Sequence, residues 1–439
     1  MGTESLIASR ERTICRVLMS FFAYMCCVER FAQHMYVHTR LGCVRVPSTM
    51  VLLVLARSAR GSSLNYCLAR LCCVCKRFNN IIYTILDEKS NHLLVTNQKS
   101  ERFRKKCAPL LSSYTSKFNI YYNWKNKQYT SRIKVSSVSY FSLQITEHYV
   151  VCATDNYMVA YTRTKDGAIN KVISRFCDSN IMNIFHWNNI IITCHSNYDI
   201  GHWKIDFEDE YKYPIVELKM YSNDYSIAAI DVTSQYIISG SRNSSIKIRK
   251  YLHEGDVERE EEIIDTKIYD ARTISIDPTG TLFIANIDKT FSTFDDIPNQ
   301  NEIVFFDISK NVEIIRRNID INYLDTKWQN PQSILMLDNN CIKKMDTRTS
   351  EFVQTWNNSM AGRVKSRYHV YNAYFTCFSS DDSYTIITGH SDGAIILWDQ
   401  RQNNPVQMYE NFTCVNAVQF DSSHMFVASD RGLHEVIFI

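Results

Sequence analysis

The sequence predicts a mainly β protein, a seven-bladed propeller preceded by a small all-α module. A unit of roughly 40 residues, with short β-type runs between polar turns, recurs through the last three quarters of the chain. In its clearest copy, residues 369–400, the runs are rich in Tyr, Phe, Ile and Thr, and the turns between them are SSDD and HSDG. The helical module is predicted from one continuous apolar stripe between residues 68 and 85.

Composition and charge indicate which kinds of partner are to be expected. At 439 residues the chain is long enough for a large core and for more than one domain. A formal net charge of +3 is small for this length and gives no reason to expect nucleic acid or an anionic membrane as the main partner. The 15 cysteines are an odd number and form no paired framework, so we expect a reduced protein of the cytoplasm or nucleus.

Residues 1–45 contain no assignable motif, and we leave this N-terminal segment unassigned. An apolar run at residues 17–28 follows basic residues, as in a signal sequence. It is too short to span a bilayer and lacks a clear small-residue cleavage site. We interpret it as a buried or poorly ordered helix, with a targeting role as the alternative.

Residues 46–90 have a helical pattern. Ser48 and Thr49 favour a helix start just before the apolar run MVLLVLA. A second helix carries apolar residues at alternating steps of three and four, at Leu68, Leu71, Cys75, Phe78, Ile82 and Ile85. Its cysteines are better explained as small packing residues than as a metal site, because no His cluster accompanies them.

The order VP, MVLLVL, LARLCCVCKRFNNI resembles an F-box. The chain departs from the F-box pattern at Val46, Lys76 and Phe78, where Leu, Arg and Trp are usual, and in its SARGSSLNYC connection. In F-boxes these helices insert against the adaptor Skp1, which links to a cullin and a ubiquitin ligase. The resemblance therefore implies that the contact with a Skp1-like adaptor is made, or supported, by Pro47, Leu52, Leu55, Leu68, Leu71, Val74 and Phe78.

Residues 91–127 are predicted to be a basic helical linker. The basic residues are Lys99, Arg102, Arg104, Lys105 and Lys106, and a proline at position 109 marks the end of this run. A basic stretch between two domains is more often a solvated helix or linker than a site for an acidic partner. We therefore interpret it as a connector, with the acidic partner as the alternative.

Residues 128–439 are predicted to form the propeller. First strands are expected to begin near Tyr140, Ile181, Ser226, Thr273, Tyr323, Tyr371 and Thr413. The seventh unit stops at Ile439 after its third strand, which would leave an open edge. The run at residues 128–136 has nothing else to pair with, so we expect it to complete the last blade and close the ring. Seven blades are therefore predicted, with six as the alternative.

The length of the unit, and the Trp-Asp that ends its third strand, resemble a WD40 propeller blade. His369, Thr388, Asp392 and Trp398 fall on positions that form a hydrogen-bonded relay in such blades, so the resemblance implies a structural role for them. We expect the full relay in the sixth unit only, because its neighbours have lost it. The third unit, for example, has Arg249 where the Trp would lie.

The residues predict no catalytic site, no metal and no cofactor. No nucleophile is paired with His369 and Asp392, and a blade relay already explains their spacing. The 12 glycines form no nucleotide-binding fingerprint, and neither paired carboxylates nor a metal-ligand cluster is present in the sequence. We expect a non-enzymatic protein.

The two resemblances together are to the F-box and WD40-repeat protein family, and the order of F-box, basic connector and divergent propeller is most similar to its dactylin-type members. Family membership would imply the substrate-recognition subunit of a Skp1-cullin-F-box E3 ubiquitin ligase, whose propeller holds the protein to be ubiquitinated. The alternative is a WD40 scaffold of another complex without a ubiquitin role.

Members of that family often recognise a phosphorylated motif with arginines on one face of the propeller, because the Arg fork matches phosphate. Arg242, Arg272 and Arg431 are the candidates for such substrate contacts, since each lies at a loop or strand start on that face. An ordinary surface Arg remains the simpler interpretation of each. Whether the expected protein substrate is phosphorylated stays open.

Overall fold

The computed structural model describes residues 36–39, 42–45, 90, 92–96, 99–108, 114–136, 139–187, 190–205, 215–222, 227–233, 235–241, 244–250, 263–288, 301–319, 323–358 and 373–439. The chain divides into two compact units, Met1–Leu86 and Asp87–Ile439. In the first unit, β1 (Tyr36–Thr39) and β2 (Gly42–Arg45) form an antiparallel pair. The F-box-like stretch up to residue 89 lies outside the described residues.

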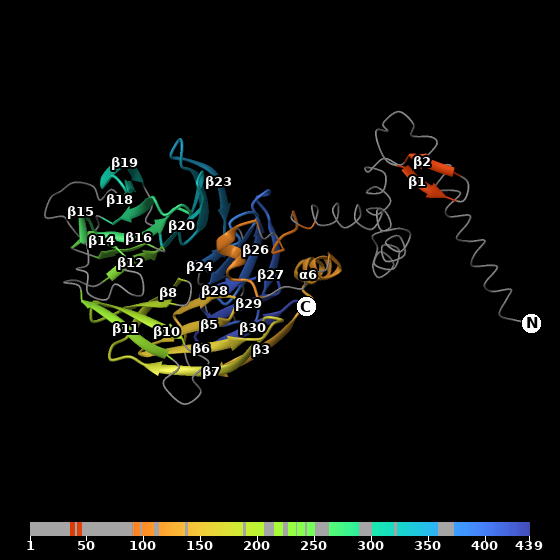
Figure 1. Ribbon diagram of the computed structural model, residues 1–439, viewed down its shortest axis with the longest axis horizontal. Helices are drawn as coiled ribbons and strands as arrows, with labels where there is room; N and C mark the ends of the chain where they lie inside the picture. The colour runs from red at the N-terminus through yellow and green to blue at the C-terminus, as the bar shows by residue number, and fades with distance from the viewer. Residues whose placement is uncertain are drawn as a thin grey trace, which may run out of the picture. The chain divides into compact units, whose positions relative to one another are not determined.

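The second unit is a seven-bladed β-propeller. Seven four-stranded antiparallel sheets follow one another along the chain, and Figure 1 shows their strands in sequence order. In every sheet each strand pairs with the next one in the chain, except where the last blade is completed by an early strand. The prediction of a mainly β fold with seven blades is confirmed.

The first four blades contain the following strands. Blade 1 consists of β4 (Ser142–Ile145), β5 (Tyr149–Thr154), β6 (Tyr157–Arg163) and β7 (Ile169–Phe176). Blade 2 consists of β8 (Ile181–Trp187), β9 (Ile190–His195), β10 (Asp199–Ile205) and β11 (Ile215–Ser222). Blade 3 consists of β12 (Ile227–Val232), β13 (Tyr236–Ser241), β14 (Ser244–Lys250) and β15 (Ile263–Tyr269). Blade 4 consists of β16 (Ala271–Ile276), β17 (Leu282–Ile287), β18 (Asn301–Asp307) and β19 (Val312–Ile319).

The last three blades follow the same order. Blade 5 consists of β20 (Asp325–Asn330), β21 (Ser333–Leu337), β22 (Cys341–Asp346) and β23 (Glu351–Asn357). Blade 6 consists of β24 (Phe375–Ser380), β25 (Thr385–His390), β26 (Ile395–Asp399) and β27 (Pro405–Tyr409). Blade 7 consists of β28 (Val415–Phe420), β29 (His424–Ser429), β30 (Gly432–Ile437) and β3 (Thr130–Ser136).

Burial falls from the second strand of a blade to its outer strand. Every residue of β5, β25 and β29 is buried, because neighbouring blades cover both faces of these strands. The outer strand β19 is exposed along most of its length and carries Glu313, Arg316 and Arg317. The buried strands are therefore the near-continuous apolar runs of the sequence, whereas the outer strands have a mixed composition.

The ring closes through β3, which pairs antiparallel with β30 from Thr130 opposite Ile437 to Ser136 opposite Gly432. This is the pairing expected for the run at residues 128–136. The junction is also held by Glu435, a fully buried carboxylate on β30. Its Oε1 accepts a 2.7 Å hydrogen bond from the backbone N of Ile169, and its Oε2 lies 3.3 Å from Nζ of Lys134.

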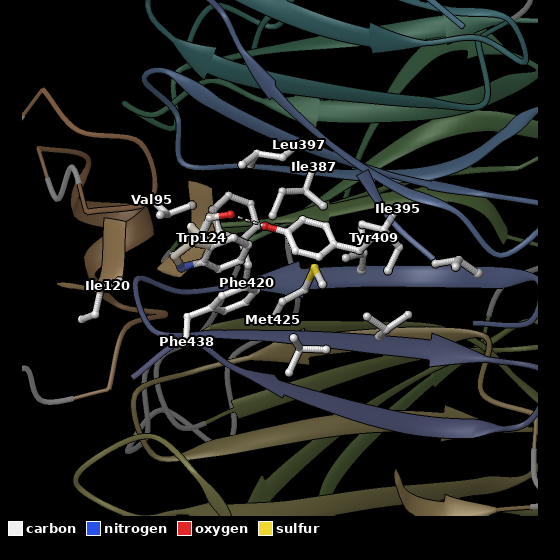
Figure 2. Close-up of a cluster of buried hydrophobic side chains, with 14 of the residues drawn as sticks. Val95, Ile120, Trp124, Ile387, Ile395, Leu397, Tyr409, Phe420, Met425 and Phe438 are labelled. Atoms are coloured by element: carbon white, nitrogen blue, oxygen red, sulfur yellow. Dashed lines mark hydrogen bonds between the residues drawn. The ribbon is translucent and has the colours of Figure 1, made fainter. Parts of the chain in front are cut away.

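The stretch predicted to be a basic linker packs against the propeller and belongs to the same compact unit. It contains two helices, α5 (Glu101–Arg104) and α6 (Tyr114–Asn126). Figure 2 shows Trp124 of α6 among apolar side chains of blades 6 and 7. Its ring is stacked on Phe438 with 3.6 Å between centroids, and its indole Nε1 donates to the Ser422 carbonyl at 3.0 Å. Apolar burial therefore outweighs the charge that suggested a solvated connector.

Two of the basic residues in this stretch also bind the propeller. Arg102 Nη2 donates to the Gln329 carbonyl at 3.3 Å, and its Nε lies 3.6 Å from Oδ2 of Asp382. Lys106 Nζ donates to Gln419 Oε1 at 3.0 Å. Burial, together with the nearby Lys327 charge, holds the pKa of Lys106 well below its usual value. The basic side chains predicted to be solvated are thus partly directed into the molecule.

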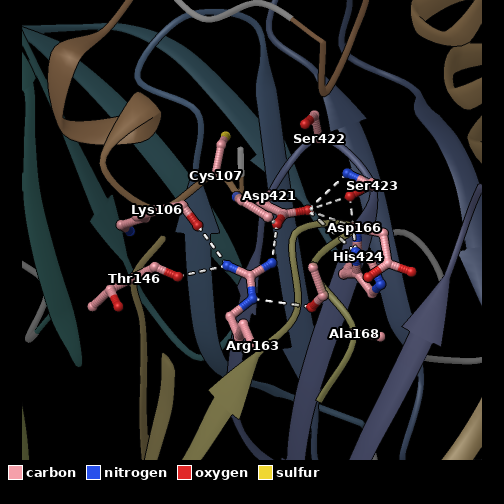
Figure 3. Close-up of polar contacts among 12 residues, drawn as sticks. Lys106, Cys107, Thr146, Arg163, Asp166, Ala168, Asp421, Ser422, Ser423 and His424 are labelled. Carbon is pink, nitrogen blue, oxygen red and sulfur yellow. Dashed lines mark hydrogen bonds and ion pairs between the residues drawn. The ribbon is translucent and has the colours of Figure 1, made fainter. Parts of the chain in front are cut away.

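A buried guanidinium joins the N-terminal stretch, blade 1 and blade 7 (Figure 3). Arg163 Nη1 donates to the carbonyls of Lys106 at 2.9 Å and Thr146 at 2.6 Å, and Nε donates to the Gly167 carbonyl at 3.0 Å. Its Nη2 forms a buried ion pair with Asp421. Burial by itself would raise the pKa of Asp421, but the Arg163 charge outweighs burial and the pKa is lowered. The carboxylate therefore stays charged.

Replacing Trp124 with Ala should lower the free energy of unfolding by about 3–5 kcal/mol, because a fully buried aromatic ring leaves a cavity. Urea denaturation of the full-length protein measures the change. Tyr122→Ala on the same helix is the control, since Tyr122 is 53% exposed and should change stability by less than about 0.5 kcal/mol. Equal effects of the two substitutions would show that α6 is not docked as described.

Arg163→Lys should destabilise the protein by about 3–5 kcal/mol, because Lys keeps the charge but cannot serve all four acceptors of the guanidinium. The measurement is again urea denaturation. Arg348→Lys is the matched control, because Arg348 pairs with Asp346 at 2.6 Å in an exposed position and should give little measurable change. A wild-type midpoint for Arg163→Lys would contradict the assigned role of this group in ring closure.

Candidate binding surface

The two ends of the propeller differ in what covers them. We define the lower face as the end that carries the turns between first and second strands, such as residues 146–148, 381–384 and 421–423. The upper face carries the turns between second and third strands and between blades, such as residues 155–156, 177–180, 196–198 and 430–431. The N-terminal stretch bonds to the lower face through Val95 to Thr385 and Ala108 to Asp421. The upper face is thus the candidate for binding other molecules.

The mouth of the ring on the upper face is lined by a repeated β-bulge. In five blades the pairing between the first and second strands shifts register after the first residue of the first strand. A bulge redirects the extra side chain away from the regular alternation. The redirected residues are Met182, Ala228, Arg272, Thr376 and Asn416. The same backbone position therefore presents apolar, cationic and neutral polar side chains in different blades.

Two of these bulge residues tie one blade to the next. The Thr376 hydroxyl donates to the Val415 carbonyl of blade 7, and Asn416 Nδ2 donates to the Tyr140 carbonyl next to blade 1 at 3.1 Å. The position is therefore structural in blades 6 and 7. Met182 has no polar group and is 57% exposed, so in blade 2 the same position adds an apolar side chain to the surface.

The three arginines predicted as substrate contacts do not form one cluster among the described residues. Arg272 is the bulge residue of blade 4, and its Nη1 lies 3.1 Å from Oδ2 of Asp288, a partner that neutralises it. Arg431 is exposed at the turn between β29 and β30, and its backbone N donates to Ser429 Oγ at 3.3 Å. Arg242 lies outside the described residues. Arg272 and Arg431 are both on the upper face.

The relay of the sixth blade lies beneath this surface. Trp398 Nε1 donates to Thr388 Oγ1 at 3.0 Å, and Thr388 Oγ1 lies 3.3 Å from Nε2 of His390, which belongs to the same strand. Asp392 is exposed and accepts a hydrogen bond from the backbone N of Ala394 in the turn. His369 lies outside the described residues. In the described part of blade 6, the His that contacts Thr388 is therefore His390.

Blade 2 contains the same arrangement, although we expected a full relay only in the sixth unit. Trp203 Nε1 donates to Thr193 Oγ1 at 2.7 Å, and Thr193 Oγ1 lies 2.7 Å from His195 Nε2. The spacing, Thr-x-His followed eight positions later by Trp, is identical in the two blades and could have identified both. In blade 3, Arg249 occupies the Trp position and donates to Ser239 Oγ at 2.8 Å. The hydrogen bond between the second and third strands is therefore retained in blade 3, although both residue types differ from those in blades 2 and 6.

Exposed apolar side chains gather on the upper face of blades 1 and 2. They come from strand ends and turns, where the sequence analysis singled out no residue. They are Phe141, Tyr157, Phe176, Met182 and Tyr198. Tyr157 and Phe176 are opposite each other on β6 and β7, with ring centroids 5.3 Å apart and planes at 70°. Large apolar side chains gathered at exposed positions are typical of sites of interaction.

Metal binding and membrane insertion find no support in the described residues. No group of three or more His, Cys, Asp or Glu side chains in that part of the chain could hold a metal ion. Nor is any described helix both long and apolar enough to cross a membrane. The seven cysteines in the described part of the second unit are free, and burial raises the pKa of Cys107 to about 12 and of Cys377 to about 12.

No protein-family model matches this chain, and no curated protein matches it either. The argument about function therefore depends on the residues and the fold. The resemblance to WD40 blades is consistent with the seven-bladed ring, and the F-box resemblance falls on residues that the structure does not describe.

His390→Gln should flatten the dependence of stability on pH between about pH 6.5 and about pH 4. Burial lowers the pKa of His390 to about 4, so across this window the unfolded chain binds a proton that the folded chain does not. The free energy of unfolding therefore falls as the pH falls, by roughly 3 kcal/mol for this group. Urea denaturation at several pH values measures the slope.

The control for this experiment is His148→Gln, since His148 is exposed on the lower face and its removal should leave the slope as in the wild type. Burial also lowers the pKa values of His195 and His434, so the variant should lose part of the slope and not all of it. An unchanged slope in His390→Gln would show that the pKa of His390 is not lowered in the folded protein.

Proposed function

We propose that this chain is a protein-recognition subunit whose propeller holds a protein ligand on its upper face. The observation that carries the proposal is the asymmetry of the ring. The lower face is bonded to the chain's own residues 92–126, whereas the upper face presents exposed aromatic rings on short, paired turns. A rigid ring with a wide exposed face suits the binding of other proteins, and it brings no chemistry of its own.

We further propose that the chain is the substrate-recognition subunit of a Skp1-cullin-F-box E3 ubiquitin ligase of the cytoplasm or nucleus. The apolar stripe that includes Leu68, Leu71 and Phe78 supports this role, because its spacing predicts a helix with one apolar face, as binding in an adaptor groove requires. The stripe ends at Ile85, only a few positions before Ser90, which is already buried in the second unit.

The proposed role requires no catalytic residue in this chain. Holding a substrate close to a ubiquitin donor raises the effective concentration of its lysines, and that is sufficient to speed transfer. The ligase partners would supply the chemistry. We therefore propose a non-catalytic adaptor that acts by holding the substrate close to the ubiquitin donor.

The second candidate function is a WD40 scaffold of a different complex. It is favoured by the weak first half of the F-box resemblance, where Val46 replaces Leu and the connection SARGSSLNYC is unusual. The two functions use the propeller in the same way. They differ in what residues 46–90 bind.

Leu71→Asp together with Phe78→Asp should abolish capture of Skp1 by the purified full-length protein, because two charges would enter an apolar helix face. Arg70→Gln with Asn79→Asp is the matched control: it changes the net charge by the same amount outside the stripe and should leave capture intact. Co-purification with recombinant Skp1 is the measurement. A folded wild-type protein that does not bind Skp1 would exclude the ligase role and leave the scaffold.

A further inference from the structure

The upper face of blades 1 and 2 presents five large apolar side chains that are 42–57% exposed. We call this set the aromatic patch, and it consists of Phe141, Tyr157, Phe176, Met182 and Tyr198. Phe141 and Met182 lie at the starts of the inner strands, whereas Tyr157 and Phe176 lie at the upper ends of the outer two strands of blade 1. Exposed apolar side chains thus extend from the mouth of the ring to its rim.

The turns that carry the patch are bonded to one another. The backbone N of Cys177 donates to the Asn156 carbonyl at 2.8 Å, and the backbone N of Ile181 donates to the Asp155 carbonyl at 2.5 Å. The backbone N of Ser196 donates to the Asn180 carbonyl at 2.8 Å. Three turns from two blades therefore form one platform, and little ordering of backbone would be needed when a ligand binds.

Tyr198 at the tip of the β9–β10 turn has a backbone φ of +76°. The left-handed region is unfavourable for a residue with a bulky side chain, and here no glycine is used. The turn is closed by a 3.1 Å hydrogen bond from the backbone N of Tyr198 to the His195 carbonyl. An exposed Tyr at a strained turn position, where Gly or Asn would cost less, points to a use for its side chain.

The charge around the patch is negative. Residues 154–157, 176–183 and 195–199 contain Asp155, Asp178 and Asp199 and no Lys or Arg. Arg175, which directly precedes Phe176 on β7, adds one positive charge, and the three carboxylates outnumber it. The one His in these three ranges, His195, is buried, and burial lowers its pKa, so it adds no positive charge at neutral pH. Asp155 and Asp178 are exposed. A surface of this kind repels phosphate groups and attracts ammonium and guanidinium groups.

We propose that the aromatic patch and its acidic turns bind a segment of a partner protein in which apolar side chains are flanked by Lys or Arg. The apolar side chains would cover the Tyr157–Phe176 pair and Met182, while the basic side chains would lie against Asp155 and Asp178. The inference rests on the proposed function, since it names the kind of protein segment that the propeller holds. It uses neither Arg272 nor Arg431.

The test is binding of short fluorescent peptides to the full-length protein, measured by anisotropy. One peptide carries Leu and Phe flanked by Lys and Arg, a second carries the same apolar residues flanked by Glu, a third carries phosphoserine, and a fourth has Ser in place of Leu and Phe. Only the basic apolar peptide should bind. Tyr157→Ser with Phe176→Ser should weaken its binding at least about tenfold, which is the scale of aromatic hot spots.

Two further variants complete the design. Asp155→Asn with Asp178→Asn should weaken binding about fivefold and reduce its dependence on salt. Tyr269→Ser with Tyr374→Ser is the matched control, because these residues are 53% and 47% exposed on the upper face of blades 3 and 6. This control should leave binding unchanged. All four aromatic positions are exposed, so the variants should keep the wild-type unfolding midpoint.

The inference is overturned if the acidic or phosphorylated peptide binds as well as the basic one, if no peptide binds, or if the control variant loses binding equally. Its failure differs from failure of the ligase role, which depends on Skp1 capture through residues 46–90. A protein that captures Skp1 but ignores the basic peptide would keep the proposed role and lose this site. A protein that binds the basic peptide but does not capture Skp1 would retain this binding site and would support the scaffold function instead.

Discussion

The guanidinium of Arg163 is the interaction on which the architecture of the second unit depends most. It lies where the ring closes, and its acceptors come from the N-terminal stretch, from blade 1 and from blade 7. Removing two charges from water is costly unless every hydrogen-bonding position is filled. Here one carboxylate and three carbonyls fill the fork, so the pair can be buried. Closure is thus specific to one register of blade 7 against blade 1.

The ion pair also explains why the N-terminal stretch stays on the lower face. The Lys106 carbonyl accepts from Arg163, and Asp421 accepts both from Arg163 and from the backbone N of Ala108. The stacking of Trp124 on Phe438 continues the same junction into blade 7. The described residues of this stretch, 92–96, 99–108 and 114–126, are therefore part of the closure and not a spacer. With the lower face used in this way, the upper face is the one left to the proposed binding of a protein ligand.

The sequence predicts the parts of this fold that depend on local pattern. The buried second strands, such as β25 and β29, are short apolar runs between turn residues, and these can be read directly. The closing strand follows from the need to cover an open edge. The docking of residues 92–126 could not be predicted in this way. Phe103 lies between Arg102 and Arg104, and its burial depends on Phe420, more than 300 positions away in the chain.

The candidate surface was harder to predict than the fold for a physical reason. A blade needs a hydrogen bond between its second and third strands. Different residue pairs provide it equally well, such as Thr388 with Trp398 in blade 6 and Ser239 with Arg249 in blade 3. A blade also accepts any side chain at the bulge, so Met182 and Thr376 occupy equivalent positions with opposite chemistry. The fold fixes where these side chains lie and leaves their identity free. The residues that would determine the proposed binding specificity are therefore those that the repeat does not constrain, and no periodic pattern in the sequence identifies them.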